Sequence, residues 1–387
     1  MPIVNRIAEL TDEVALWRQD LHRNPELMFD VFRTSGVVEE KLRQFGCDEV
    51  VTGIGRTGVV GVIRGRKGAG PAIGLRADMD ALPILEATDV AYKSETPGKM
   101  HACGHDGHTA MLLGAARYLA ETRNFAGTAV VIFQPAEEGG GGGREMVEDG
   151  MMDRFGVEQV YGMHNMPGVP VGAFAIRPGP FMASADRFGV EIAGRGGHAA
   201  MPQNCIDPIV AGAQIINALQ TIASRNVGPV DSVIVSVTQF HAGSANNIIP
   251  QTAHLTGTIR ALKKETRALA RQRFHEIVEG VAALNQCNVK IDFEDGYPVT
   301  INHEAETEFA TRIAREIVGE DKVMANAEPV MGAEDFSYML EARPGAFIFI
   351  GNGQTAGLHH PEYDFNDKAL PFGVSYWARL VETALAA

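Results

Sequence analysis

Short apolar runs that end abruptly in polar residues recur along the chain. Four of them cover residues 72–77, 128–133, 157–161 and 347–350, and they precede Asp78-Met-Asp80, Gln134-Pro-Ala-Glu-Glu138, His164-Asn165 and His359-His360, respectively. Such runs are typical of strands that are buried on both faces of a largely parallel sheet. Ligands of these sheets collect outside the carboxyl ends of the strands. The pattern therefore predicts that the polar tails converge on one crevice.

The middle of the chain has a different texture. Helical and strand patterns alternate up to about residue 182, beginning with an amphipathic N-terminal helix, and they resume from about residue 297. Between these points we predict a strand at 185–193, a helix at 208–224, strands at 231–241 and 252–262, a helix at 265–284 and a strand at 287–294. This β-α-β-β-α-β order is that of a ferredoxin-like fold. We therefore expect an α/β domain (residues 1–183 and 297–387) with an inserted ferredoxin-like α+β domain (residues 184–296).

Length and composition also favour two domains. A chain of 387 residues with 45% hydrophobic content is longer than most chains that fold around a single hydrophobic core. The formal net charge of −14 argues against a nucleic-acid partner and against binding to anionic lipids. The first residues lack the apolar segment of a secretory signal, and no run approaches the ~18 apolar residues of a membrane helix. The four cysteines are scattered without Cys-x-x-Cys spacing. We expect a cytoplasmic protein without a membrane or nucleic-acid partner.

The segment His101-Ala-Cys-Gly-His-Asp-Gly-His108 is the strongest candidate for chemistry, since it gathers a thiol and three imidazoles. Cys103 and His105 lie two positions apart, so both side chains can face one point on a loop but would diverge on a helix. We therefore expect a loop here, followed by a buried helix from Thr109, whose N-terminus would favour a thiolate at Cys103. The alternative is structural: Cys103 would be a small core residue and His105 a hydrogen-bonded loop histidine.

Further motifs give the chain a family resemblance. They run in order over nearly the whole sequence: Leu21-His-Arg-Asn-Pro-Glu26, Ala77-Asp-Met-Asp-Ala-Leu-Pro83, the segment 101–108, Gln134-Pro-Ala-Glu-Glu-Gly139, Gly162-Met-His-Asn165, Gly196-Gly-His-Ala-Ala200, Asn247-Ile-Ile-Pro250, Gly257-Thr-Ile-Arg260 and Gly332-Ala-Glu-Asp-Phe336. The chain resembles the M20 metallopeptidase superfamily, in its aminoacylase, hippurate hydrolase and auxin-conjugate hydrolase branch. The resemblance implies a zinc-peptidase-like catalytic domain with a mixed sheet flanked by helices, an inserted lid domain that often dimerises, and a two-metal hydrolytic site.

The resemblance also implies roles for individual residues. The expected metal ligands are Cys103, His105, Glu138, His164 and His359. In Leu358-His-His-Pro361, His359 occupies the ligand position of the motif and His360 the variable one, and adjacent imidazoles on an extended segment point in opposite directions. Of the adjacent acids, Glu138 is the expected ligand and Glu137 the general acid/base. His198 of the lid is the expected further donor to the oxyanion.

Other residues are candidates for supporting roles. Asn247 and Arg260 are candidate binders of a substrate carboxylate, although Arg260 could instead form a structural ion pair, and His198 without the resemblance reads as a surface histidine. Asp78 and Asp80 are expected to orient ligand imidazoles rather than to bind metal. Three further residues of the segment 101–108 could share that task, and the sequence does not rank them: His101, Asp106 and His108.

These observations predict a metal-dependent hydrolase of linear amides that cleaves an N-acyl amino acid to a carboxylic acid and a free amino acid. Its cofactors would be two divalent ions per chain, Zn, Mn, Co or Ni, and the chain would form a homodimer or homotetramer through the lid. A dipeptidase or carboxypeptidase on the same scaffold is the first alternative, and a non-catalytic metal-dependent binding protein is the second. The sequence leaves open the acyl group, the amino acid, the native metal and the pathway.

Overall fold

The computed structural model describes residues 5–386, and the chain divides into two compact units. Unit 1 contains the described residues up to Phe181, then Ile301–Glu328, and the described residues from Asp335 onward. Unit 2 contains Met182–Thr300 and the short segment Pro329–Glu334. Each unit has its own buried apolar core.

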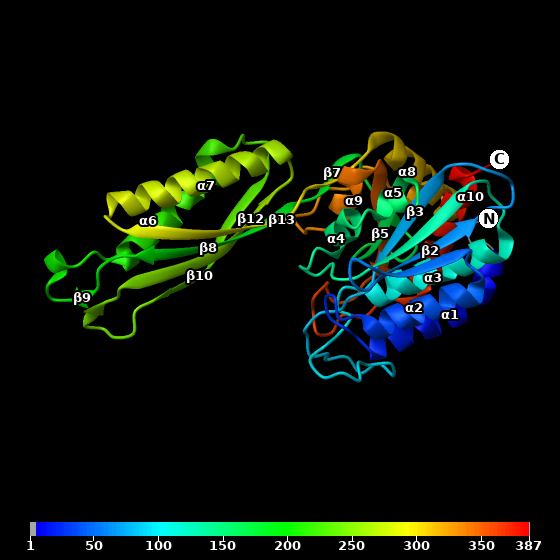
Figure 1. Ribbon diagram of the computed structural model, residues 1–387, viewed down its shortest axis with the longest axis horizontal. Coiled ribbons are helices and arrows are strands. Elements are labelled where there is room, and N and C mark those ends of the chain that lie inside the picture. The colour runs from blue at the N-terminus through cyan, green and yellow to red at the C-terminus, as the bar shows by residue number, and fades with distance from the viewer. Residues whose placement is uncertain (1–4, 387) are drawn as a thin grey trace. The chain divides into compact units, whose positions relative to one another are not determined.

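Unit 1 is built on an eight-stranded mixed sheet (Figure 1). The strands lie side by side in the order β1 (Glu49–Ile54), β2 (Gly58–Arg64), β4 (Thr128–Gln134), β3 (Ala72–Asp78), β5 (Val157–Pro167), β16 (Gly345–Gly353), β6 (Phe174–Ala175) and β15 (Val323–Met324). The central strands β4, β3, β5 and β16 are parallel, whereas β1 and β2 pair antiparallel at one edge. Parallel strands end at the same edge of a sheet, so the polar residues that follow them are brought together.

Helices cover both faces of this sheet, which is why its central strands are apolar on both sides. Three helices pack together on one face in Figure 1: α1 (Asn5–Arg23), α2 (Phe32–Phe45) and α3 (His105–Thr122). They are joined by α10 (Leu370–Ala384), and α8 (Glu304–Val318) packs on α10 and on β16. The other face carries α4 (Gly142–Glu148), α5 (Met151–Arg154) and α9 (Phe336–Ala342). The short elements are β7 (Gly179–Met182), which pairs with β14 (Thr300–Asn302), and the 3-10 turns Glu320–Lys322 and Asp367–Ala369.

Unit 2 has a four-stranded antiparallel sheet with two helices on one face (Figure 1). Along the chain, its elements are β8 (Ser184–Ala193), α6 (Pro208–Thr221) with a π-turn at Ile222–Asn226, β10 (Val233–Ala242), β12 (Thr252–Ala261), α7 (Lys264–Leu284) and β13 (Asn288–Tyr297). The spatial order β10-β12-β8-β13 is the ferredoxin-like arrangement. The predicted fold class is therefore confirmed, with two short additions, β9 (Gly197–His198) paired with β11 (Ile248–Ile249) and the 3-10 turn Pro202–Asn204.

Two local predictions are wrong. Helix α3 begins at His105, four residues before the predicted start, so the expected loop ends at Gly104. Strand β5 does not end before His164 and Asn165 but runs through both of them to Pro167. In both cases burial overrides the local pattern, since almost every residue of α3 and of the middle of β5 is inaccessible to solvent. None of the helices in the described part of the chain is both long and apolar enough to cross a bilayer.

Candidate metal centre

The site begins at Gly104, the residue that joins the short segment carrying Cys103 to helix α3. Gly104 has a φ of +85°, a left-handed backbone conformation that side chains with a Cβ disfavour. A Cβ here would also lie 2.3 Å from the amide nitrogen of Asn165 and 2.4 Å from the hydroxyl of Tyr363. Glycine therefore lets the backbone turn sharply, so that Cys103, before the turn, and His105, on the first residue of α3, face the same point.

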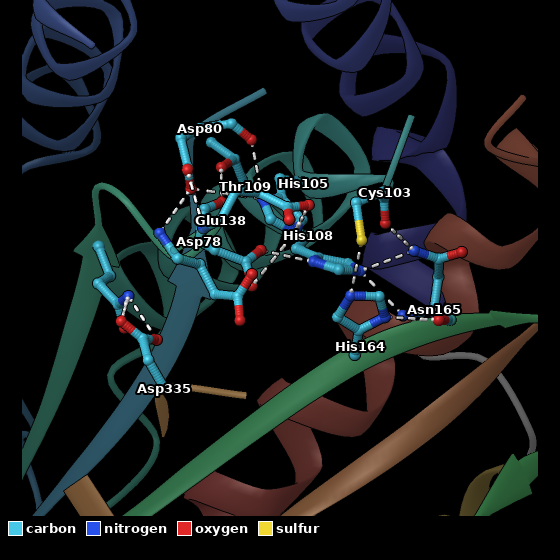
Figure 2. Close-up of polar contacts among 12 residues, drawn as sticks. Asp78, Asp80, Cys103, His105, His108, Thr109, Glu138, His164, Asn165 and Asp335 are labelled. Carbon is cyan, nitrogen blue, oxygen red and sulfur yellow. Dashed lines mark hydrogen bonds and ion pairs between the residues drawn. The ribbon is translucent and has the colours of Figure 1, made fainter. Parts of the chain in front are cut away.

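Two imidazoles are fixed in matching ways (Figure 2). The Nδ1 of His105 donates to the backbone oxygen of Asp80 at 2.8 Å, and the Nδ1 of His164 donates to the backbone oxygen of Asn165 at 2.6 Å. Each ring therefore presents its Nε2 to the space between them. The His105 Nε2 is buried and has no hydrogen-bond partner among the residues that the structure describes. Anchoring one ring nitrogen in this way is how proteins orient imidazoles that bind metal.

Cys103 lies at the centre of the group. Its Sγ is 3.4 Å from the Nε2 of His164, and the donor atoms of Cys103, His105 and His164 all lie within 4.8 Å of one another. A second set with the same spacing consists of Cys103, Glu138 and His359. Because the thiol belongs to both sets, one sulfur can serve two ions.

The second set includes an exposed residue. The Nε2 of His359 lies 3.2 Å from a carboxylate oxygen of Glu138, and His359 has a φ of +64°. Such a backbone conformation is uncommon for a residue other than glycine and often marks a functional position. The neighbouring His360 instead accepts the backbone N–H of Glu362 through its Nδ1. The structure thus brings the five predicted ligands together and gives His360 another contact.

The charges around the site favour a cation. Burial raises the pKa of the Cys103 thiol well above its usual range, and the charges of Glu138, Glu137 and Asp78 raise it further. Burial alone would lower the pKa of His105, but the charge of Asp78 and the bond to Asp80 raise it to about 10. In the protein without a metal, burial and the nearby carboxylates therefore outweigh any stabilisation of a Cys103 thiolate by the N-terminus of α3. A divalent cation fits these donors, since it would replace the protons on sulfur and imidazole.

The adjacent acids Glu137 and Glu138 are held through their backbone. The two carboxylate oxygens of Asp80 accept the N–H groups of Glu137 and Glu138 at 2.9 and 3.1 Å. The same residue accepts from His105 through its backbone oxygen. Both carboxylate oxygens of Asp80 thus bond to the loop after β4. Asp80 therefore supports the site by fixing the backbone of both glutamates.

Comparisons with known proteins agree with this geometry. The sequence profile of "Peptidase family M20/M25/M40" matches residues 74–383. The chain belongs to this family. It is 44% identical over 380 residues to a hippurate hydrolase of Campylobacter jejuni, with 98% of each chain covered. It is 41% identical to thermostable carboxypeptidase 2 of Saccharolobus solfataricus, with 93% of this chain and 91% of that one covered.

A solved structure shares the architecture. It is a dinuclear metal-binding peptidase of the M20 family from Bacillus subtilis, and it matches with a TM-score of 0.85 and 35% identity over 98% of this chain and 99% of the other. The suspected family is therefore confirmed. The metal-ligating capacity of the cluster around Cys103 also agrees with the dinuclear site of this relative.

Sequence reasoning missed a buried ion-pair network beneath this M20 site. Arg76 in β3 contacts Gln134 through Nε at 2.8 Å, Asp78 through Nη1 at 2.7 Å and Asp335 through Nη2 at 3.0 Å. The signal was present, because an arginine inside an otherwise apolar buried strand must be paired. Its partners Gln134 and Asp335 lie 58 and 259 residues away along the chain, so the sequence alone could not identify them.

The three predicted residues of unit 2 lie in two places. His198 on β9 is exposed, and the strand β11 opposite it directly follows the exposed Asn247. Arg260 is far from these two residues. It lies near the end of β12, whereas Thr252, at the start of that strand, closely follows β11; eight residues of strand separate Thr252 from Arg260 by about 27 Å. Its Nη1 donates to the backbone oxygen of Met331 at 3.1 Å, and among the described residues no carboxylate pairs with it. This argues against the structural ion pair as an explanation of Arg260.

Proposed function

We propose that this member of family M20 is a metal-dependent amidohydrolase that cleaves N-acyl amino acids to a carboxylic acid and a free amino acid. The observation that carries the proposal is the buried meeting point of the Cys103 thiol with the imidazoles of His105 and His164. Both imidazoles are anchored through Nδ1 and directed through Nε2, which is costly to build unless a cation is bound there. The hippurate hydrolase relative supports the substrate class.

Two divalent ions, Zn, Mn, Co or Ni, are proposed as cofactors, held by Cys103, His105, Glu138, His164 and His359. When bound, such ions lower the pKa of a coordinated water from ~15.7 towards ~7 and stabilise the oxyanion that forms during amide hydrolysis. Thiolate and imidazole suit zinc, while a carboxylate ligand also suits the other metals. The mixed donor set is why we leave the native metal open.

Glu137 is the proposed general acid/base. It is 6% exposed, and Asp80 accepts its backbone N–H, so its backbone is fixed beside the proposed ligand Glu138. In this role Glu137 accepts the proton of the attacking water and then delivers it to the leaving nitrogen of the amide. Because the two glutamates are adjacent but differently exposed, one can bind metal while the other moves the proton.

Unit 1 is the proposed catalytic domain and unit 2 the proposed lid. His198 would donate a hydrogen bond to the developing oxyanion. Arg260 is a proposed binder of the substrate carboxylate, because its guanidinium is half-buried without a carboxylate partner among the described residues. Asn247 is the other proposed binder, and because it lies near the opposite end of β12, the Asn247 and Arg260 of one chain would not hold the same carboxylate together. The lid is also the proposed surface for a homodimer or homotetramer, supported by the exposed apolar residues Ile209 and Val210 of α6 and Phe240 on the edge strand β10.

A dipeptidase or carboxypeptidase activity is the second candidate, favoured by the similarity to the carboxypeptidase of Saccharolobus solfataricus. A free α-amine on the substrate needs an acidic partner, whereas an acyl group needs an apolar one. A non-catalytic binding protein would have lost the base or some ligands, and this chain keeps all of them. The proposed cytoplasmic location rests on the sequence.

The test is metal reconstitution followed by a substrate panel. Protein stripped with EDTA should regain activity with at least one of Zn, Mn, Co or Ni. Acetyl-, benzoyl- and indoleacetyl-amino acids should be hydrolysed with a higher kcat/KM than dipeptides. Faster turnover of dipeptides would select the peptidase alternative, and full activity of the stripped protein would refute a metal-dependent reaction.

A further inference from the structure

His108 is a third buried imidazole beside the candidate metal centre, and its contacts differ from those of His105 and His164 (Figure 2). Its Nδ1 lies 2.6 Å from a carboxylate oxygen of Asp78. Its Nε2 accepts the backbone N–H of Asn165 at 2.8 Å. Because a backbone N–H can only donate, Nε2 must be the unprotonated nitrogen, and Nδ1 therefore carries the proton that Asp78 accepts. Neither nitrogen is left for a metal.

Asn165, whose backbone N–H donates to His108, directly follows the proposed ligand His164 on β5. Its side-chain amide donates to the backbone oxygen of Cys103 at 2.6 Å, and its side-chain oxygen accepts the hydroxyl of Tyr363 at 2.8 Å. The hydrogen bond to His108 thus holds the peptide group between His164 and Asn165. The side chain of Asn165 in turn holds the backbone of Cys103. Two proposed ligands depend on the position of this one residue.

Asp78 is fixed from the opposite side. Its other carboxylate oxygen accepts from Nη1 of Arg76 at 2.7 Å, and the guanidinium of Arg76 is itself held by Gln134 and Asp335. All members of the chain from Arg76 through Asp78 to His108 are at most 1% exposed. Buried polar groups that are fully paired are rigid, since each would lose a hydrogen bond on moving.

We propose that Arg76, Asp78 and His108 form a buried relay that positions His164 and Cys103, with His108 as a positioning residue and not a ligand. This inference rests on the proposed function, because it concerns the geometry of the same metal centre. Arg76 fixes Asp78, Asp78 fixes the tautomer and tilt of His108, and His108 holds the β5 backbone at Asn165.

A separate metal site at this place is the competing explanation, because donor atoms of Asp78, His105 and His108 lie within 4.8 Å of one another. A metal bound through Nδ1 of His108 would require the proton to move to Nε2. That proton would then face the N–H of Asn165, 2.8 Å away, so two donors would oppose each other in a buried space. The hydrogen-bond geometry therefore favours the relay.

Two substitutions each remove one of the two hydrogen bonds of His108 and keep the other. His108→Asn keeps a donor near the position of Nδ1 and loses the acceptor for Asn165, whereas His108→Gln places an acceptor near the position of Nε2 and loses the donor for Asp78. The matched control is His101→Asn, because His101 is equally buried, lies two residues before Cys103, and has no hydrogen-bond partner among the described residues. Each variant is loaded with Co(II), and its metal affinity is measured by competition with a chelator, together with the thiolate-to-cobalt charge-transfer band.

The relay predicts that His108→Asn still binds two Co(II) ions but about 10–100-fold more weakly, with a shifted charge-transfer band. His108→Gln should retain more of the affinity, and His101→Asn should stay near the wild type. Wild-type affinity and spectrum in both His108 variants would overturn the proposal, as would an equal loss in His101→Asn. Loss of one whole equivalent of metal in His108→Asn would instead identify a ligand. If wild-type protein binds no divalent ion, the proposed function fails first, so the two failures are distinguishable.

Discussion

The buried candidate residues of unit 1 and the exposed ones of unit 2 are held in opposite ways. In unit 1, Cys103, His105 and His164 are at most 6% exposed, and each is fixed by the backbone or by a neighbouring polar group. In unit 2, His198 and Asn247 are exposed and have few side-chain contacts. This difference is expected if the unit 1 residues form a preorganised metal centre while the proposed substrate-contacting groups of unit 2 remain adaptable. Changes to the buried residues around Cys103 should therefore alter metal binding, and changes to His198 should alter catalysis without altering metal content.

The largest effect is expected for Glu137, the one proposed site residue of unit 1 whose replacement should lower catalysis without changing metal content. Glu137→Gln removes the proposed base but keeps the size and the backbone contact to Asp80. We expect kcat to fall by about 10³-fold or more, while metal content stays near that of the wild type. Steady-state kinetics and elemental analysis check this, with the exposed Glu148→Gln on α4 as the control. Unchanged kcat in Glu137→Gln would remove Glu137 from the mechanism.

Cys103→Ser should follow the rule for unit 1. Serine keeps the shape but replaces a soft sulfur that belongs to both donor sets. We expect metal affinity to fall by more than about 100-fold, beyond the ~10–100-fold typical of supporting residues. Chelator competition measures the affinity, and Cys47→Ser, at the partly buried second free thiol of unit 1, should bind metal normally. Equal affinities in the two variants would favour the structural explanation of Cys103.

His198→Ala tests the rule for unit 2. Because the side chain is exposed, its loss should change the free energy of unfolding by no more than about 0.5 kcal/mol. We expect kcat/KM to fall by about 10²-fold with full metal occupancy, as for other oxyanion donors. His254→Ala, at another exposed histidine of unit 2, is the control. If both variants hydrolyse the substrate at the wild-type rate, His198 has no role in the reaction.

The last prediction concerns the stability of unit 1 and not its activity. Burial alone would lower the pKa of His22, but Asp106, next to His105, and then Glu86 outweigh it and raise the pKa from 6.5 to about 9. A raised folded-state pKa means that the stabilisation is complete below pH 6.5 and is lost as the pH rises through 9.

His22→Gln should therefore be less stable than the wild type by up to about 3 kcal/mol at pH 6, and the difference should narrow towards pH 10. Urea denaturation at both pH values measures this, with His303→Gln in the same unit as the control. A difference that does not change with pH would show that His22 carries no charge in the fold.

Sequence reasoning succeeded where the pattern was local. The alternation in unit 2 predicted its strands and helices to within a few residues, because each strand has one covered and one open face. It failed at the start of α3, where the polar run His-Asp-Gly-His disguised a helix. The structure explains the glycine of that run, since a Cβ at Gly107 would lie 2.3 Å from the ring of Phe365. Only a contact between residues 258 positions apart reveals why glycine is needed there.

The candidate site divides in the same way. Cys103, His105 and the Glu137-Glu138 pair stood out because their residue types are chemically informative at short spacing. The sequence named His108 only as one of three unranked candidates for a supporting role, because its contacts are to the Asn165 backbone and to Asp78, both distant along the chain. A sequence motif indicates which residues can bind a metal. The hydrogen bonds of the folded chain then show which of those residues have a ligand atom left for it.

Anomalous scattering from crystals loaded with zinc or manganese tests the central claim most directly. The account predicts two peaks in unit 1, about 3.5–4 Å apart, both within bonding distance of the Cys103 sulfur, which is about 2.3 Å for zinc. Neither peak should lie within bonding distance of His108. A loaded crystal whose peaks avoid Cys103, or a single peak between Asp78 and His108, would contradict the account.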